Sequence, residues 1–265
     1  MSATLHFGTQ GWAYPDWIGV FYPPGAKQED YLPFYSQVFD TVELDTTFYH
    51  APRAAIARSW EKRVPPHFRF AAKVPRAITH DAALSGCEAE FSAFVVSLDP
   101  LGEKRGPLLV QLPAEFKRSE DTHRTLSQFL LAVPTGVKIA VEFRDVSWHG
   151  AETYDLLKER GAALAWTAWR ELPSATRVTA DFLYVRWLGV REWIGKYDRV
   201  TLDRAAEHDA WEADLRRALP EVREVFGYFN NHWAGHSPAS ANEMKRRLGL
   251  VPVDPRERWS QRELW

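Results

Sequence analysis

Acidic and basic side chains recur near the ends of several hydrophobic segments of this chain. In the segment 139–144, IAVEFR, Glu142 and Arg144 alternate with apolar residues. Successive residues of a strand point to opposite faces, so this segment would have an apolar face and a face carrying an acid and a base. Glu43 has an equivalent position in an earlier segment. Two carboxylates in unequal surroundings can divide the roles of general acid and general base.

Basic side chains occupy comparable positions. Lys73, Arg144 and Arg186 each fall near the end of a hydrophobic segment. Three cations near a few carboxylates predict unpaired positive charge, which an anion would neutralise. Arginine also suits the planar, bidentate geometry of phosphate and carboxylate. We therefore expect Arg144 and Arg186 to hold an anionic ligand while Glu142 or Glu43 transfers protons. On this interpretation, removing one arginine would weaken binding more than folding.

These residues need a scaffold in which several strands end together. Strand-like segments recur at Leu5–Gly11, Thr41–Thr47, Arg69–Pro75, Pro107–Pro113, Lys138–Arg144, Ala162–Thr167, Phe182–Leu188 and Glu224–Asn230. Most of the intervals contain a segment with helical spacing, the clearest being 53–64, 122–133, 205–219 and 239–249. The last of these has Ser237 as a candidate N-cap, Pro238 in its first turn and Gly249 after its last turn.

Strands that alternate with helices indicate parallel strands joined by crossover helices. Eight such units close naturally as a (β/α)8 barrel, the TIM-type fold. A doubly wound open sheet is the alternative, but no G-x-G-x-x-G motif or P-loop opens a helix here. We expect one domain over residues 1–265, with residues 250–265 as a C-terminal tail that packs on the barrel or extends from it.

In such a barrel the apolar face of each strand meets the helices, and the other face meets the barrel axis. The polar residues that this rule turns inward near the strand ends are Gln10, Glu43, Asp45, Lys73, Gln111, Glu142, Arg144, Arg186 and Asn230. The sixth segment leaves the choice between Trp166 and Thr167 open. Burying so many polar groups is unfavourable, which points to function. A structural ion-pair network, for instance Glu142 with Lys73 or Arg186, is the alternative.

Aromatic residues follow several of the predicted strands. Long irregular segments at 12–30 and 187–200 lie where the active-site loops of a barrel belong. We expect five aromatic residues to border the mouth and to stack on a flat ligand, namely Trp12, Tyr14, Phe48, Tyr49 and Trp148. Packing at the rim is the alternative for each of them.

Composition narrows the class of protein. A net charge of −2 over 265 residues gives no general attraction to nucleic acid or anionic membranes. The single cysteine, Cys87, rules out an intramolecular disulfide and a multi-cysteine metal site, and it fits a reducing compartment. No apolar run reaches the length of a membrane span, and the first residues lack a signal-peptide pattern. We expect a cytoplasmic protein without membrane partners.

Seven motifs in order resemble a known family. They are GTQGWAYPDWIGVFYP, FDTVELDTTFYHAP, FRFAAKVPRAITH, GPLLVQLPAEF, AVEFRDVSW, YVRWLG and YFNNHWAGHSPASAN, between about Phe7 and Gly249. The chain resembles the YecE-like family, domain of unknown function 72 (DUF72). The resemblance implies a TIM-type barrel and a bacterial or archaeal protein whose reaction is not established.

The resemblance also implies site residues. The matching positions are Gly11, Trp12, Glu43, Thr47, Phe48, Tyr49, Lys73, Pro75, Thr79, His80, Gln111, Pro113, Glu142, Phe143, Arg144, Trp148, Arg186, Asn230 and Asn231. From these we take Glu43, Glu142, Lys73 and His80 as catalytic candidates. The substrate-binding candidates are Gln10, Trp12, Tyr14, Asp45, Phe48, Tyr49, Gln111, Arg144, Trp148, Arg186, Asn230, Asn231 and His232. Many relatives have aspartate at position 232 and histidine at 188, where this chain has His232 and Leu188, which predicts a different substrate preference.

Three functions fit these residues. The first is a hydrolase of a phosphate-bearing substrate, with a nucleic-acid phosphodiester as the boldest version, because aromatic loops around a cationic mouth can stack bases. The loop after the eighth strand runs into a helix N-terminus, the usual phosphate position in such barrels. The second is a carbohydrate-active hydrolase or isomerase that uses paired glutamates. The third is a non-catalytic binding or scaffold protein.

A metal site is less favoured by the sequence. Glu43, Asp45, Glu142, His80 and His232 are possible ligands. The interleaved lysine and arginine side chains would repel a divalent ion, so we predict no metal ligand. The sequence does not specify a cofactor or a partner protein.

Overall fold

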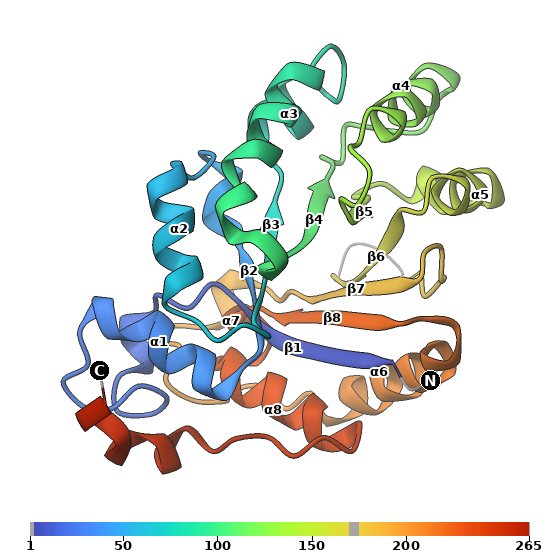
Figure 1. Ribbon diagram of the computed structural model, residues 1–265. Helices are drawn as coiled ribbons and strands as arrows, with labels where there is room; N and C mark the ends of the chain where they lie inside the picture. Colours follow the sequence, from blue (N-terminus) through green and yellow to red (C-terminus); the bar gives the residue numbers. More distant parts are fainter. Residues whose placement is uncertain (1–2, 170–174, 265) are drawn as a thin grey trace.

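Eight parallel strands form a closed barrel in the computed structural model, which describes residues 3–169 and 175–264 (Figure 1). The strands are β1 (Thr4–Gln10), β2 (Thr41–Leu44), β3 (Arg69–Lys73), β4 (Arg105–Gln111), β5 (Ile139–Glu142), β6 (Ala163–Ala168), β7 (Phe182–Trp187) and β8 (Glu224–Phe229). Each strand pairs with the next along the chain, and β8 pairs with β1. The predicted TIM-type (β/α)8 barrel is therefore confirmed.

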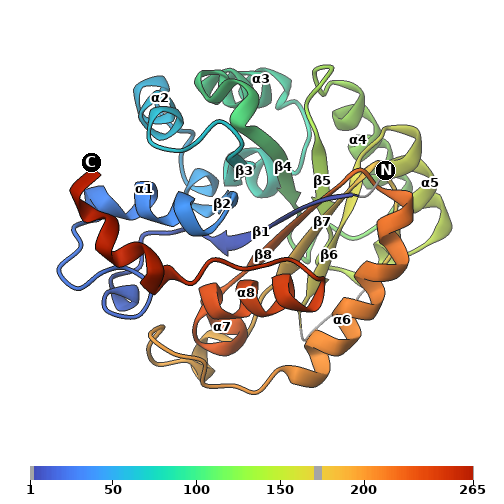
Figure 2. The ribbon, with the colours of Figure 1, turned by 60° about the horizontal axis from the view of Figure 1, so that its bottom comes forward.

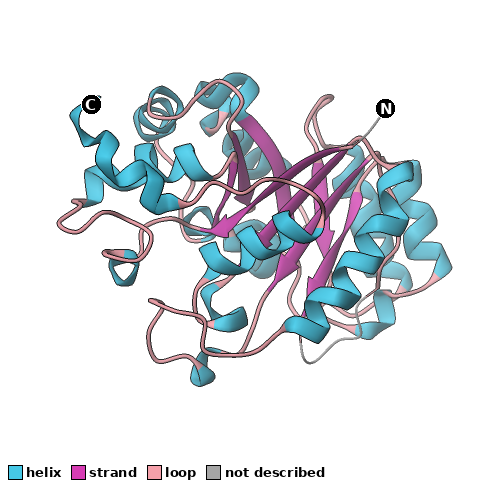
Figure 3. Ribbon diagram, turned by 90° about the horizontal axis from the view of Figure 1, so that it is seen from below, coloured by secondary structure: helices cyan, strands magenta, loops and turns pink. Residues whose placement is uncertain are grey.

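Helices surround the strands, as Figure 2 and the view from below in Figure 3 show. They are α1 (Gln28–Val38), α2 (Ala54–Lys62), α3 (Glu88–Ser97), α4 (Glu120–Leu131), α5 (Ala151–Glu159), α6 (Ala205–Ala218), α7 (Asn231–Ala234) and α8 (Ser237–Arg247). Between β6 and β7 the described residues contain no helix. None of the helices described is long and apolar enough to cross a membrane.

Two hydrophobic layers follow from the alternation of the strands. Val42, Phe70 and Leu108 belong to the large outer cluster that packs under the helices. The inner cluster combines small residues such as Ala71 with the rings of Tyr184, Phe226 and others. Small side chains leave room for these rings inside a narrow barrel. The open question on the sixth strand is settled in the same way: Trp166 lies in the outer cluster, so Thr167 faces inward, opposite Arg186 on β7.

Most strands end one to three residues earlier than the sequence pattern predicts, β2 by the largest margin. β2 ends at Leu44, and the chain continues as a 3₁₀ helix over Asp45–Phe48. This turn is stabilised because the Thr47 hydroxyl donates to the carbonyl oxygens of Leu44 and Lys73, both at 2.7 Å. β5 likewise ends at Glu142.

The start of α8 also differs by one residue from the prediction. His236 occupies the N-cap and Ser237 is the first helical residue. The backbone N–H and the hydroxyl of Ser237 both donate to Asn231 Oδ1, at 3.0 and 2.8 Å. The polar group that satisfies this helix end thus comes from α7, a partner that the local sequence does not reveal.

The C-terminal segment runs along the outside of the barrel beside α1 (Figures 1 and 2). It contains a 3₁₀ helix, Pro255–Leu264. Trp259 Nε1 donates to the carbonyl oxygen of Phe21 at 3.0 Å, and Asn242 Nδ2 donates to that of Val253 at 3.4 Å. These contacts hold the segment against the loop before α1 and against α8.

Gly8 allows α1 to approach β1 closely. A Cβ atom at this position would lie 2.1 Å from the Thr41 carbonyl oxygen and 2.8 Å from the Tyr35 hydroxyl. That hydroxyl accepts a hydrogen bond from the Thr9 N–H at 2.9 Å and donates to the Thr41 carbonyl at 3.0 Å. Only a residue without a side chain fits between these groups.

We expect Gly8→Ala to lower the free energy of unfolding by at least about 1–3 kcal/mol, because the added methyl group must displace the β2 backbone or Tyr35. Urea unfolding followed by circular dichroism would measure this change. Gly195→Ala is the control, because a Cβ atom there meets nothing within 4 Å. Equal stability of the two variants would contradict the close approach.

Candidate functional site

A buried arginine joins two carboxylates from different strands. Arg186 on β7 donates to Glu43 on β2 through Nε and Nη2, both at 2.9 Å, and to Glu142 on β5 through Nη1 at 2.7 Å. Exposure of these three residues is only 3%, 0% and 0%, respectively. The Tyr184 hydroxyl adds a fourth hydrogen bond, to Glu43 at 2.7 Å. Arg186 therefore fixes both carboxylates and is itself inaccessible to a ligand.

Arg144 lies on the outer side of Glu142. Its Nη2 forms an ion pair with Glu142 Oε1, so the carboxylate has an arginine on each oxygen. The guanidinium carbon lies 3.9 Å from the centre of the Trp169 ring, a cation–π contact that fixes its plane. The Arg144 side chain is 11% exposed, compared with 3% for that of Arg186. A ligand at the mouth would thus meet Arg144 before Arg186.

Lys73 is the second cation near the surface of the cluster. Its Nζ lies 3.9 Å from the centre of the Phe48 ring and 3.7 Å from Asp45 Oδ1. The Asp45 side chain is 49% exposed, so this pair is loose and partly screened by water. His80 packs edge-on against the same Phe48 ring, with centroids 5.1 Å apart. Lys73 and His80 therefore both contact the Phe48 ring, and Asp45 lies beside Lys73.

The surroundings separate the proton affinities of these groups. Burial by itself raises the pKa of Glu142, but Arg144 and Arg186 reverse this and lower it to about 2. Burial raises the pKa of Glu43 above its usual value, and Arg186 only partly offsets the increase. The pKa of the Lys73 ammonium is lowered by burial and by the positive charge of Arg186. The different neighbours of Glu43 and Glu142 thus shift the pKa values of the two carboxyl groups in opposite directions.

The expectation of unpaired positive charge is wrong. Each of Lys73, Arg144 and Arg186 faces a carboxylate within 4.0 Å. The cations and the carboxylates Asp45, Glu43 and Glu142 are equal in number, so the cluster is close to neutral. The ion-pair network that the sequence offered as an alternative is present, although Lys73 pairs with Asp45 and not with Glu142.

Amide side chains line the next positions around the barrel. Gln10 pairs in register with Glu43, and its Oε1 accepts from Asn230 Nδ2 at 2.8 Å. Gln10 is 3% exposed, and its Nε2 has no hydrogen-bond partner among the described residues. Gln111 pairs in register with Glu142 and is half-buried. Five predicted inward residues therefore lie in two groups, Gln10 with Glu43 and Asn230, and Gln111 with Glu142.

Only some of the aromatic residues that were predicted to border the mouth lie against the charged cluster. The Tyr14 hydroxyl donates to the Gln10 carbonyl oxygen at 2.7 Å, and Phe48 lies under Lys73, so these two rings adjoin the cluster. Tyr49 packs edge-on against Phe48 and remains 69% exposed. Trp12 contacts Trp60 on α2, with ring centroids 5.9 Å apart.

The predicted place of Trp148 at the mouth is wrong. Its side chain is fully buried and stacks on Phe116 and Phe143, with centroids 5.4 and 4.7 Å away. Its Nε1 donates to the Phe116 carbonyl oxygen at 2.6 Å. Phe143 points toward the helices, and Trp148 follows it into the outer hydrophobic layer because stacking there buries both rings.

Two residues after β8 form hydrogen bonds with other loops of the barrel. Asn231 is 2% exposed, and its Oδ1 accepts from Ser237 and, at 3.3 Å, from Trp17 Nε1. His232 Nε2 and the Tyr197 hydroxyl are 2.7 Å apart. Asn231 therefore connects the first and last loops of the barrel, and His232 contacts the loop after β7, where Leu188 also lies.

Sequence reasoning omitted two residues from the predicted site. Tyr184 lies two residues before Arg186 on the same strand face, and this spacing was a usable signal. Trp169 lies one residue beyond β6, and its contact with Arg144 depends on the closure of the barrel. Among the residues described, no group of three or more His, Cys, Asp or Glu side chains is placed to hold a metal ion.

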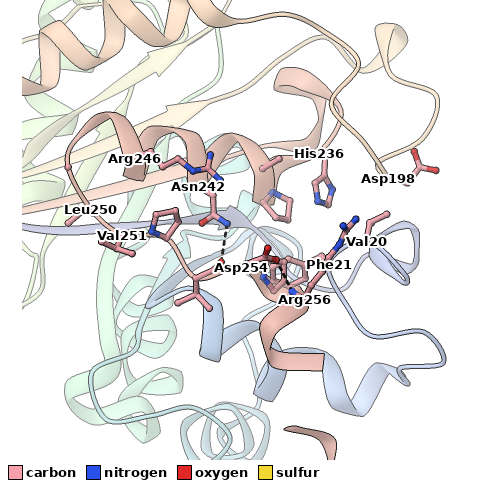
Figure 4. Close-up of a pocket in the computed structure, with 16 residues that line it drawn as sticks. Val20, Phe21, Asp198, His236, Asn242, Arg246, Leu250, Val251, Asp254 and Arg256 are labelled. Carbon is pink, nitrogen blue, oxygen red and sulfur yellow. Dashed lines mark hydrogen bonds between the residues drawn. The ribbon is translucent and has the colours of Figure 1, made fainter. Parts of the chain in front are cut away.

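A cavity of about 800 Å³ lies away from this cluster, between α8, the loop before α1 and the C-terminal segment (Figure 4). His236, Asn242 and Arg246 line one side of it, and Phe21 and Arg256 line the other. None of the predicted site residues lines it. Its mixture of acidic and basic side chains favours no single class of ligand.

Comparison with known proteins gives the family. Residues 6–262 match the family described as "Protein of unknown function DUF72". The chain is 26% identical to the UPF0759 protein YunF of Bacillus subtilis, over 94% of this chain and 98% of YunF. It is 31% identical to the UPF0759 protein YecE of Escherichia coli over 140 residues, which are 53% of this chain and about half, 48%, of the length of YecE.

Solved structures agree with this result. A DUF72 family protein of Thermotoga maritima superposes with a TM-score of 0.80 at 28% identity, covering 93% of this chain and 99% of the other. A second, from Enterococcus faecalis, shares the fold with a TM-score of 0.78 at 22% identity, covering 95% and 98%. The resemblance seen in the motifs is thus confirmed, and the chain belongs to the DUF72 family.

Proposed function

We propose that the cluster at the C-terminal ends of the strands is the catalytic site of an enzyme that hydrolyses a phosphate-bearing substrate by acid–base chemistry. One observation carries the proposal: Arg186 holds two buried carboxylates of opposite pKa shift directly beneath two more accessible cations, Lys73 and Arg144. Strongly perturbed groups at the C-terminal mouth of a barrel are typical of catalytic sites.

The accessible residues take the direct roles. Arg144 is held flat on Trp169 and is more exposed than Arg186, so it is the arginine that a phosphate oxygen would contact. Lys73 has a lowered pKa and a loosely paired ammonium group, so it is the better proton donor for a leaving oxygen. Glu43, Glu142 and Arg186 are positioning residues, because their charges are paired with one another beneath the surface.

The carbohydrate alternative is less well supported. A glycosidase needs one carboxyl group to protonate the leaving oxygen and another to attack or to activate water. Both oxygens of Glu43 are occupied by Arg186 and Tyr184, and both oxygens of Glu142 face arginines. Neither carboxylate is available to a sugar without breaking a buried ion pair.

The test is hydrolysis of phosphomonoesters, phosphodiesters, oligonucleotides and oligosaccharides by the purified protein. We expect activity on at least one phosphoester, and we expect Lys73→Met to lower kcat at least about 100-fold, as loss of a general acid does. Arg144→Gln should raise KM more than it lowers kcat, because it removes a substrate contact.

The control is Lys158→Gln, which removes an exposed lysine from the last turn of α5. It should leave both constants unchanged. Circular dichroism of each variant would show that the barrel is intact. Turnover of oligosaccharides alone, or undiminished phosphoester turnover by Lys73→Met, would refute the proposal.

A further inference from the structure

A second pocket, of about 700 Å³, lies between α1, the connection from α2 to β3 and the C-terminal segment. Its polar lining comprises Ser36, Gln37, Lys62, Arg63, His67 and Arg258. The α2–β3 connection leads into the N-terminal end of a strand, so this basic pocket lies at the opposite end of the barrel from Lys73 and Arg144. It is therefore separate from the proposed catalytic site.

The charges in the basic pocket have one sign. Lys62, Arg63 and Arg258 line it together with His67, and no acidic residue is among the described residues that line it. None of these three cations has a carboxylate within 4.0 Å among the described side chains, whereas most other lysines and arginines do. Arg258 also has a buried Nε without a hydrogen-bond partner among the described residues. Unpaired cations that converge on a concave site attract an anion.

Helix electrostatics explain only part of this arrangement. Lys62 is in the last turn of α2 and Arg63 is its C-cap, where the helix dipole favours positive charge. Arg258 belongs to a different segment, so the dipole of α2 does not account for its position. Its neighbour Trp259 is bonded to the Phe21 carbonyl oxygen, and this contact holds the segment against the body of the protein. The position of Arg258 in the pocket therefore depends on the tertiary packing of the C-terminal segment.

We infer that the basic pocket binds a small phosphate-bearing anion. Two guanidinium groups from separate segments can each grip phosphate oxygens in the bidentate manner that arginine favours. A volume of about 700 Å³ is within the usual range of small-molecule sites. Such a ligand would join the C-terminal segment to α1 and α2. This site goes beyond the proposed hydrolysis at the mouth and does not depend on it.

The test is calorimetric titration of the full chain with pyrophosphate, ATP and a short oligonucleotide at low and moderate salt. We expect pyrophosphate or ATP to bind, more weakly as salt rises, and we expect Arg63→Gln and Arg258→Gln each to raise Kd about tenfold or more. Tighter binding of ATP than of pyrophosphate would identify a nucleotide, and equal binding would identify the phosphate group alone. Both results support the inference.

Lys158→Gln is the control for the loss of one positive charge, because Lys158 is an exposed lysine in the last turn of α5 and does not line the basic pocket. It should bind as the parent protein does. Lys73→Met separates the two sites: loss of binding in this variant alone would place the anion at the mouth and overturn the inference while leaving the proposed function standing. Binding of the oligonucleotide only, or unchanged affinity in Arg63→Gln and Arg258→Gln, would also overturn it.

Discussion

Arg186→Ala is expected to lower the free energy of unfolding by about 3–5 kcal/mol, because it leaves buried carboxylates without their partner. Glu43 loses its two hydrogen bonds from Arg186 and keeps only that from Tyr184, and Glu142 keeps only Arg144. This reverses the expectation from the sequence that removing an arginine would weaken binding more than folding. The reason is that Arg186 lies inside the barrel, where the unpaired charges have little access to water.

Urea unfolding at neutral pH would measure the loss, with Arg124→Ala as the control. Arg124 is 66% exposed and pairs with an exposed aspartate, so its removal should change stability by less than about 1 kcal/mol. Arg186→Lys should recover only part of the loss, because an ammonium group cannot donate to both carboxylates in the same geometry. If Arg186→Ala were as stable as Arg124→Ala, the buried network would not exist in solution.

The second large effect is expected on the free energy of unfolding at acidic pH. The pKa of Glu142 is about 2 in the folded protein, compared with an ordinary value of 4.5. A depressed pKa means that the stability contributed by Glu142 is fully present above pH 4.5 and is lost as the pH falls toward 2. The shift corresponds to about 3 kcal/mol. Glu43 has a raised pKa and so acts with the opposite sign, as a group whose contribution is lost when the pH rises.

The measurement that isolates Glu142 is the difference in unfolding free energy between the parent protein and Glu142→Gln, followed from pH 7 to pH 2. This difference should be largest near neutral pH and should shrink by about 3 kcal/mol on acidification, because the protonated acid resembles the amide. Glu103→Gln, at an exposed position where the described side chains form no ion pair with it, should change stability little across this range. A difference for Glu142→Gln that stays constant with pH would contradict the assigned pKa.

The sequence by itself was sufficient to predict the barrel fold. Strand and helix periods depend on local contacts, so the alternation of apolar residues located the strands and predicted which side chains face the axis. The inward positions of Glu43, Lys73, Glu142 and Arg186 follow from that alternation and from the rule that parallel strands end together. Thus these four members of the cluster were predictable without coordinates, whereas Trp169 was not.

Only the tertiary structure decided how these charges are paired and which of them a ligand can reach. Arg186 lies far from both carboxylates along the chain, and its position between them depends on the closure and stagger of the barrel. Trp148 points toward the helices because it stacks there on two other aromatic rings. Arg258 lines the basic pocket because the C-terminal segment packs beside α1. Local periodicity determines the face of a residue, whereas its partners and its exposure depend on segments distant in sequence.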